Sequence, residues 1–272
     1  MSTPSTPPHR WVVDPSDPRA PTREIWESLT PAERAAVVAS LPSDPGWEVA
    51  PPEGDDHYEA ADGPRKALRR FFGKSGRRAY VGTNLSVYYP NERVFAPDLF
   101  VVLDVEPHRR AKWVVGDEGK GLDFVLEIHV AGDWRKDFVT NVERYARLGI
   151  PEYFAFNLRT GVLTGHRLSP GATRYAPIAP DASGFVSEVL GLELFVQGDR
   201  VRFFHSGAQL PELEELVGRL ESAMGETMGR LGALEQELEQ ERAAREQERA
   251  AREQAELRVA ELERLLAERD KT

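Results

Sequence analysis

The chain has no cysteine among its 272 residues. This absence excludes disulfide bonds, thiolate metal sites and cysteine nucleophiles. No apolar run is long enough to span a bilayer, and residues 1–8 lack the apolar core of a signal peptide. Gly-rich phosphate loops, Gly-x-Ser-x-Gly elbows and His-Glu-x-x-His zinc motifs are also missing from the sequence. We therefore expect a soluble, cytoplasmic protein without a membrane partner.

Charge is distributed unevenly along the chain. Residues 211–272 contain 17 acidic and 10 basic residues, a net charge of −7 out of the total of −10. The remaining residues carry only −3, so the body of the protein is close to neutral. The acidic total therefore does not exclude a nucleic-acid partner.

The N-terminal third contains the signals for a leading segment and a first helix. Residues 1–22 are rich in proline and poor in apolar anchors, which predicts a flexible N-terminal segment. The motif Thr30-Pro31-Ala32-Glu33 combines a capping threonine, a proline suited to the first helical position and a glutamate that can reach back to the cap. We expect an N-terminal helix within residues 23–45, ending before Pro42.

Residues 46–206 have the pattern of one α+β domain. Phe124-Val125-Leu126 is nearly continuous in apolar character, as expected for a strand buried on both faces. Helical spacing is expected at 57–72 and 136–148, and strands at 80–89, 98–105, 112–115, 122–129, 152–157, 163–168, 174–178 and 200–204. This order predicts a mixed central sheet flanked by helices.

Residues 211–272 have the pattern of a long C-terminal coiled-coil helix. Apolar residues follow alternating steps of four and three from Leu213 to Leu238, as in a coiled-coil seam. The segment 240–246 then repeats as 247–253, and places Glu241, Arg245, Glu248 and Arg252 in that seam. Two interpretations stay open at this point. The helix either associates, as a homo-oligomer with a dimer expected or by recruiting a partner, or it is a single charged helix held by pairs four residues apart.

Two carboxylates in strand-like runs are candidates for a metal site. Asp98 follows Pro97 at the start of one run, and Glu127 lies 29 residues later near the end of a very apolar run. A carboxylate buried there is costly unless it is paired, hydrogen-bonded or bound to a metal. Two such groups at one end of a sheet suit Mg²⁺, with Mn²⁺ as the alternative. Alternatively, Asp98 caps a turn and Glu127 pairs with a basic side chain.

The segments around these acids resemble a known family. The run from Ala96 to Val105 resembles the PD strand of the Uma family of restriction endonuclease-like proteins, within the PD-(D/E)XK superfamily, and the run from Glu118 to Ile128 resembles its second, glutamate-containing strand. Asp137, Tyr145 and the segment 149–154 match the helix and strand that follow in the family. The resemblance covers roughly residues 47–204. It implies a restriction-endonuclease-like fold, with Asp98 and Glu127 as ligands of Mg²⁺.

The chain departs from this family at the position of a lysine. The superfamily places the lysine two residues after the second acid, where this chain has His129, and the Uma family commonly moves it to the following helix, where this chain has Asn141. An asparagine can donate a hydrogen bond but supplies no charge. Lys136 lies beside Asp137, but neighbouring helix residues face different directions, so we do not expect it to replace the missing lysine well. Glu59 is a candidate for a further acid, while a capping or packing role is expected for His57.

A basic segment precedes the first strand. Residues 65–78 contain seven cations and no acid, namely Arg65, Lys66, Arg69, Arg70, Lys74, Arg77 and Arg78. Such a stripe can bind DNA phosphates without sequence preference. It is equally typical of a solvated helix face.

The leading hypothesis is a Mg²⁺-dependent endonuclease that hydrolyses DNA. The expected catalytic residues are Asp98, Glu127, His129, Asp137, Asn141 and Tyr145. The alternative is a catalytically inactive protein with a nuclease fold that binds nucleic acid or assembles through its coiled coil. A third possibility is a structural coiled-coil protein capped by its globular body.

Overall fold

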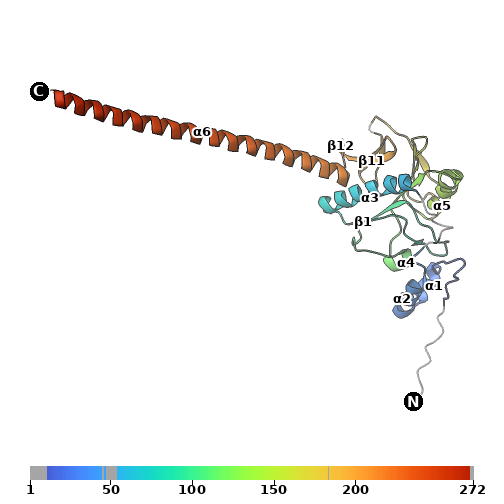
Figure 1. The fold of residues 1–272 in the computed structure, drawn as a ribbon. Coiled ribbons are helices and arrows are strands. Elements are labelled where there is room, and N and C mark those ends of the chain that lie inside the picture. Colours follow the sequence, from blue (N-terminus) through green and yellow to red (C-terminus); the bar gives the residue numbers. More distant parts are fainter. Residues whose placement is uncertain (1–10, 45, 47–53, 183, 270–272) are drawn as a thin grey trace, which may run out of the picture. The chain divides into compact units, whose positions relative to one another are not determined.

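The computed structural model describes residues 11–44, 46, 54–182 and 184–269 (Figure 1). The chain divides into two compact units at Leu213 and Glu214. The first unit is an α+β domain with a mixed central sheet, and the second is a single long helix. The mixed α+β domain and the long C-terminal helix confirm the predicted fold class, while the coiled coil stays a prediction.

The first unit begins with two short helices in place of the one expected within 23–45. They are α1 (Arg23–Ser28) and α2 (Pro31–Ser40), which are separated by extended backbone at Leu29 and Thr30. The capping box predicted at α2 is present, because Glu33 N donates to Thr30 Oγ1 at 3.3 Å and Thr30 N donates to Glu33 Oε2 at 2.7 Å. The two helices pack against the domain through one cluster of apolar residues, which includes Trp26, Val37, Leu41, Tyr88 and Val114.

The prediction of a flexible leading segment is wrong for residues 11–22, while residues 1–10 lie outside the described part of the chain. Trp11 and Val13 pack against the same apolar cluster as α1 and α2. Arg19 and Ala20 form β-bridges with Arg93 and Pro90. The segment is thus anchored by backbone pairing, which its proline-rich composition does not indicate.

The central sheet has six strands in the order β1-β3-β5-β6-β7-β8. Their bounds are Ala79–Gly82, Leu99–Leu103, Phe124–His129, Glu152–Asn157, Val162–Arg167 and Ala176–Ile178. Only β5 and β6 pair in parallel, so the sheet is mixed as predicted. Every residue of β3 and of β5 is buried, which explains why both sequences are almost continuously apolar.

The run expected to form one strand over 80–89 is divided. Gly82 ends β1, and Asn84 takes a positive φ of 48° that turns the chain. The rest forms β2 (Val87–Tyr88), which pairs in parallel with β4 (Trp113–Val114) in a separate two-stranded sheet. A short helix, α4 (Val115–Glu118), follows β4.

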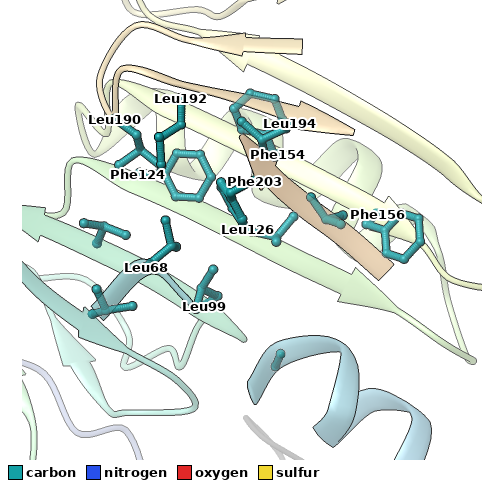
Figure 2. Packing of buried hydrophobic residues seen from close by; sticks show 14 of the residues in the cluster. Leu68, Leu99, Phe124, Leu126, Phe154, Phe156, Leu190, Leu192, Leu194 and Phe203 are labelled. Atoms are coloured by element: carbon teal, nitrogen blue, oxygen red, sulfur yellow. The ribbon is translucent and has the colours of Figure 1, made fainter. Parts of the chain in front are cut away.

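A second sheet lies against the first and was only partly predicted. Its order is β12-β11-β10-β9, with bounds Ala208–Gln209, Arg200–His205, Leu192–Gln197 and Phe185–Ser187. Figure 2 shows Leu192, Leu194 and Phe203 of this sheet packed with residues of β5 and β6. Strand β11 was expected, but its hairpin partner β10 was not, although Gly191 and Gly198 bracket it with the turns of a hairpin.

The two faces of the central sheet are covered differently. Helix α3 (Asp55–Ser75) and the second sheet pack on the face that carries Phe124, Leu126 and Ile128. The opposite face, which carries Val125, packs against α5 (Asn141–Arg147) and the π-helical turn η1 (Lys136–Thr140) that precedes it. Because side chains alternate along a strand, Glu127 faces the η1–α5 side.

The second unit is α6 (Leu213–Arg269). It continues without interruption through the charged repeat at 240–253. In the described part of the chain, no helix is long and apolar enough to cross a membrane.

Candidate active site

Asp98 and Glu127 are brought together by the pairing of β3 with β5. The antiparallel register sets Leu99 opposite Leu126, so the next step along the ladder sets Asp98 opposite Glu127. Each carboxylate accepts a hydrogen bond from a backbone amide on the opposite strand: Asp98 N donates to Glu127 Oε2 at 3.2 Å, and Ile128 N donates to Asp98 Oδ2 at 2.6 Å. Both carboxylates therefore lie at one point of the sheet.

Glu127 is buried among polar groups of α5. Its residue is 5% exposed, and its Oε1 accepts hydrogen bonds from Tyr145 Oη at 2.5 Å and Asn141 Nδ2 at 3.5 Å. Burial raises the pKa of Glu127 well above its usual value, and the nearby charges of Asp98 and Asp137 raise it further. The hydrogen bond from Tyr145 and the charge of Lys136 oppose that rise. Without a cation, the carboxylates repel one another.

Asp137 is the third acid of the cluster. Its Oδ2 lies 3.2 Å from His129 Nδ1, and its Oδ1 accepts from Asn141 Nδ2 at 3.3 Å. Its backbone oxygen accepts from Tyr153 Oη at 2.6 Å, which fixes the start of the helix against β6. Burial raises the pKa of Asp137, and the charge of Asp98 adds to the rise. All six side chains predicted to form the catalytic group thus lie in one hydrogen-bonded and electrostatic network.

The π-helical turn η1 determines which side chains face this network. Asn141 N donates to Lys136 O, a bond between residues five apart. In a regular α-helix, residues five apart lie about 140° apart around the axis. The wider turn reduces that angle, so that Lys136 lines the same cleft as Asn141 and Tyr145. Lys136 thus lines the cleft, which the geometry of a regular α-helix does not predict.

The first turn of α3 supplies one residue to the site and directs another away from it. His57 is 2% exposed, and its Nε2 lies 3.2 Å from Asp98 Oδ2. Glu59, which was considered as a further acid, is exposed and pairs with Arg200 at 2.6 Å. The histidine and not the glutamate belongs to the candidate site.

A cleft opens beside Glu127 and is flanked by cations. Its lining includes Glu127, Lys136 and Asn141 together with Arg93 and Arg144. Arg144 is held by Glu92 Oε1 at 3.1 Å and by the ring of Phe95, whose centroid lies 4.6 Å from the guanidinium carbon. The sequence does not point to either arginine as part of the site. Arg93 lies five residues before Asp98 and Arg144 lies seven residues after Asp137, so no short motif links them to the acids.

The basic segment 65–78 is only partly available for a ligand. Arg65 and Lys66 pair with Asp62 at 3.4 and 2.7 Å. Arg77 pairs with Asp104 at 3.4 Å and Arg78 with Glu106 at 2.5 Å. The other three cations, Arg69, Arg70 and Lys74, are exposed on α3, and no ion pair of theirs is found within the described ranges.

Comparisons with known proteins point to one family. A family model described as "Putative restriction endonuclease" (Uma2) matches residues 43–197, more than half of the chain. Among solved structures, the chain is similar to a "putative nuclease belonging to DUF820" from Anabaena variabilis ATCC 29413, at 15% identity and a TM-score of 0.40. That match covers 52% of this chain and 76% of the other. No curated protein matches the chain.

Proposed function

The chain belongs to the Uma2 family of restriction endonuclease-like proteins, and from this premise we propose that it hydrolyses DNA phosphodiester bonds with the help of Mg²⁺. The observation that carries the proposal is the pair Asp98 and Glu127, set side by side with Asp137 close enough to raise the pKa of Glu127. Acids that raise the pKa of a neighbouring buried carboxyl do not stabilise a fold. They are a good preparation for a divalent cation, which would relieve their repulsion.

The donor set suits Mg²⁺ better than a metal that needs a complete protein cage. Within the described residues, no three histidine, aspartate or glutamate side chains are grouped so that they could enclose an ion. Mg²⁺ is usually held by one or two carboxylates and keeps several waters and substrate oxygens. Asp98 and Glu127 would hold it. The ion, when bound, would polarise the scissile phosphate and increase the acidity of a bound water.

The surrounding side chains orient these acids and carry the positive charge. Tyr145 and Asn141 hold Glu127 Oε1 with hydrogen bonds, and His57 Nε2 lies 3.2 Å from Asp98 Oδ2. Burial raises the pKa of Tyr145 well above its usual value, so its hydroxyl stays a neutral donor. Lys136 takes the role for which His129 and Asn141 lack a fixed charge: it lines the cleft, its charge lowers the pKa of Glu127 and Asp137, and its ammonium would stabilise negative charge that develops on the phosphate.

Substrate binding is assigned to cations around and beyond the cleft. Arg93 and Arg144 line the cleft and suit the oxygens of a phosphodiester. Arg69, Arg70 and Lys74 lie 12 to 17 residues beyond His57 on α3, about 18 to 26 Å along the helix axis.

The test is cleavage of supercoiled plasmid in Mg²⁺ or Mn²⁺. We expect the wild type to nick or linearise the plasmid, and Asp98→Asn and Glu127→Gln to lose at least about 100-fold in rate, because a metal contributes several kcal/mol and each ~1.4 kcal/mol is tenfold. The matched controls are Asp117→Asn and Glu143→Gln, both at exposed acids.

The controls should cut as the wild type does. DNA binding without cleavage in any metal would contradict the proposal and support the inactive binding module instead. Cleavage that survives Asp98→Asn would show that the activity belongs to another site or to a contaminant.

A further inference from the structure

Helix α6 exposes a seam of large apolar side chains. Leu220, Met224, Leu231 and Leu234 are between 55% and 62% exposed, and Val217 and Leu238 nearly half. Together with Thr227, which lies between Met224 and Leu231, they follow alternating steps of three and four residues, so all lie on one stripe of the helix. Exposed apolar stripes of this length mark association surfaces.

A solitary helix does not explain the first half of α6. Four glycines occur within residues 218–232, and glycine is the least favourable helix residue after proline. The stabilising ion pairs four residues apart lie elsewhere, at Glu241–Arg245, Arg249–Glu253 and Arg252–Glu256. The glycine-rich half therefore requires packing against a partner. All four glycines lie outside the seam, where an added Cβ would meet no other atom.

We propose that this partner is a second copy of the chain, aligned parallel and in register. With Leu213 at heptad position d, the residues that flank the seam occupy positions e and g. In the parallel dimer, a residue at g faces the partner's residue five positions later. Three such pairs carry two charges, and all three are opposite in sign: Arg230 with the partner's Glu235, Glu237 with the partner's Arg242, and Arg258 with the partner's Glu263.

A fully overlapped antiparallel dimer is disfavoured by the seam. Full antiparallel overlap sets Leu231 against Glu248, Leu234 against Arg245 and Leu238 against Glu241. Each of these contacts buries a charge against leucine. The parallel arrangement instead stacks leucine on leucine, and it sets Glu241, Arg245, Glu248 and Arg252 each beside its own copy, next to layers of the opposite charge.

The charged layers give the seam a defined register. Glu241, Arg245, Glu248 and Arg252 alternate in sign along the seam, and Arg245 already lies 2.6 Å from Glu241 within one helix. A slip of one heptad would set Leu234 against the partner's Glu241 and Leu238 against the partner's Arg245. Polar residues in a seam cost stability and select one register. The in-register arrangement is thus favoured because it keeps Leu234 and Leu238 away from these charges.

Sedimentation equilibrium and cysteine crosslinking of the full chain test the proposal. The chain has no cysteine, so a single introduced thiol is the only one present. We expect a dimer at micromolar concentration, and Leu234→Cys crosslinked by a short bismaleimide, because position d meets its own copy only in the parallel register. Ser222→Cys lies on the outer face at position f and should stay uncrosslinked.

A monomeric full chain would overturn the proposal. So would a dimer in which Leu234→Cys fails to crosslink, or in which Ser222→Cys crosslinks as well as Leu234→Cys. None of these readouts depends on nuclease activity, so the proposal stands or falls separately from the proposed function.

Discussion

Replacement of Glu127 by glutamine should separate the structural cost of the acid cluster from its affinity for metal. Glutamine has nearly the same volume and keeps an oxygen that can accept from Tyr145. Because folding raises the pKa of Glu127, the native state binds its proton more tightly than the unfolded chain does. The wild type therefore carries no penalty below the unfolded pKa and loses stability as pH rises through the folded pKa. Without metal, Glu127→Gln should melt higher than the wild type at pH 8, and this advantage should disappear near pH 4.

Added Mg²⁺ should reverse the order. At a free concentration of one hundred times Kd, bound metal stabilises the native state by about 2.7 kcal/mol. For a unit of about 200 residues, each kcal/mol raises Tm by about 2–4 °C. We therefore expect the wild type to gain roughly 5–11 °C, and Glu127→Gln to gain almost nothing, because it has lost one of two charged ligands.

Differential scanning calorimetry in EDTA and in MgCl₂ provides both measurements. Glu143→Gln is the matched control, since Glu143 is an exposed acid on the same helix, and it should respond to Mg²⁺ as the wild type does. Two results would refute the reasoning: a Glu127→Gln variant that is less stable than the wild type in EDTA at pH 8, or one that gains as much from Mg²⁺.

Three further predictions follow from other parts of the molecule. Lys136→Met should move the acidic limb of the pH–rate profile to higher pH, because Lys136 lowers the pKa of Glu127 and Asp137. Lys136→Arg should keep the wild-type profile, and a wild-type profile in Lys136→Met would exclude Lys136 as the cation of the site. The triple change of Arg69, Arg70 and Lys74 to alanine should reduce the slope of log K against log salt by about 0.9 per lost phosphate contact, and an unchanged slope would remove these cations from the interface. Glu237→Arg and Arg242→Glu should each weaken the dimer about 4- to 30-fold, while the double variant recovers it, and equal weakening by all three would contradict the proposed register.

The central part of the fold can be predicted from the sequence because its signals are local and strong. Strand β6 has the expected bounds, and the apolar run at Phe124 forms the buried strand that carries Glu127. The capping box at Thr30 forms as its residue types require. Each depends on residues within one turn or one strand.

The remaining features depend on contacts that no local pattern records. Ala20 is held by backbone pairing with a segment about seventy residues away, so its proline-rich surroundings are misleading. Lys136 reaches the site only because the helix begins with a π-turn, for which neither periodicity nor propensity gives a sign. His57 becomes part of the site because α3 packs next to β1 and β5. Tertiary packing decides these three cases.

The rate of Mg²⁺-dependent cleavage of a labelled DNA duplex, measured for the wild type, Asp98→Asn and Asp117→Asn, tests the candidate active site most directly. We expect the wild type and Asp117→Asn to cut at equal rates in Mg²⁺ and to stop in EDTA, with Asp98→Asn at least about 100-fold slower in Mg²⁺. Equal rates for Asp98→Asn and Asp117→Asn, or no cleavage by the folded wild type in any divalent metal, would contradict a nuclease built on Asp98 and Glu127.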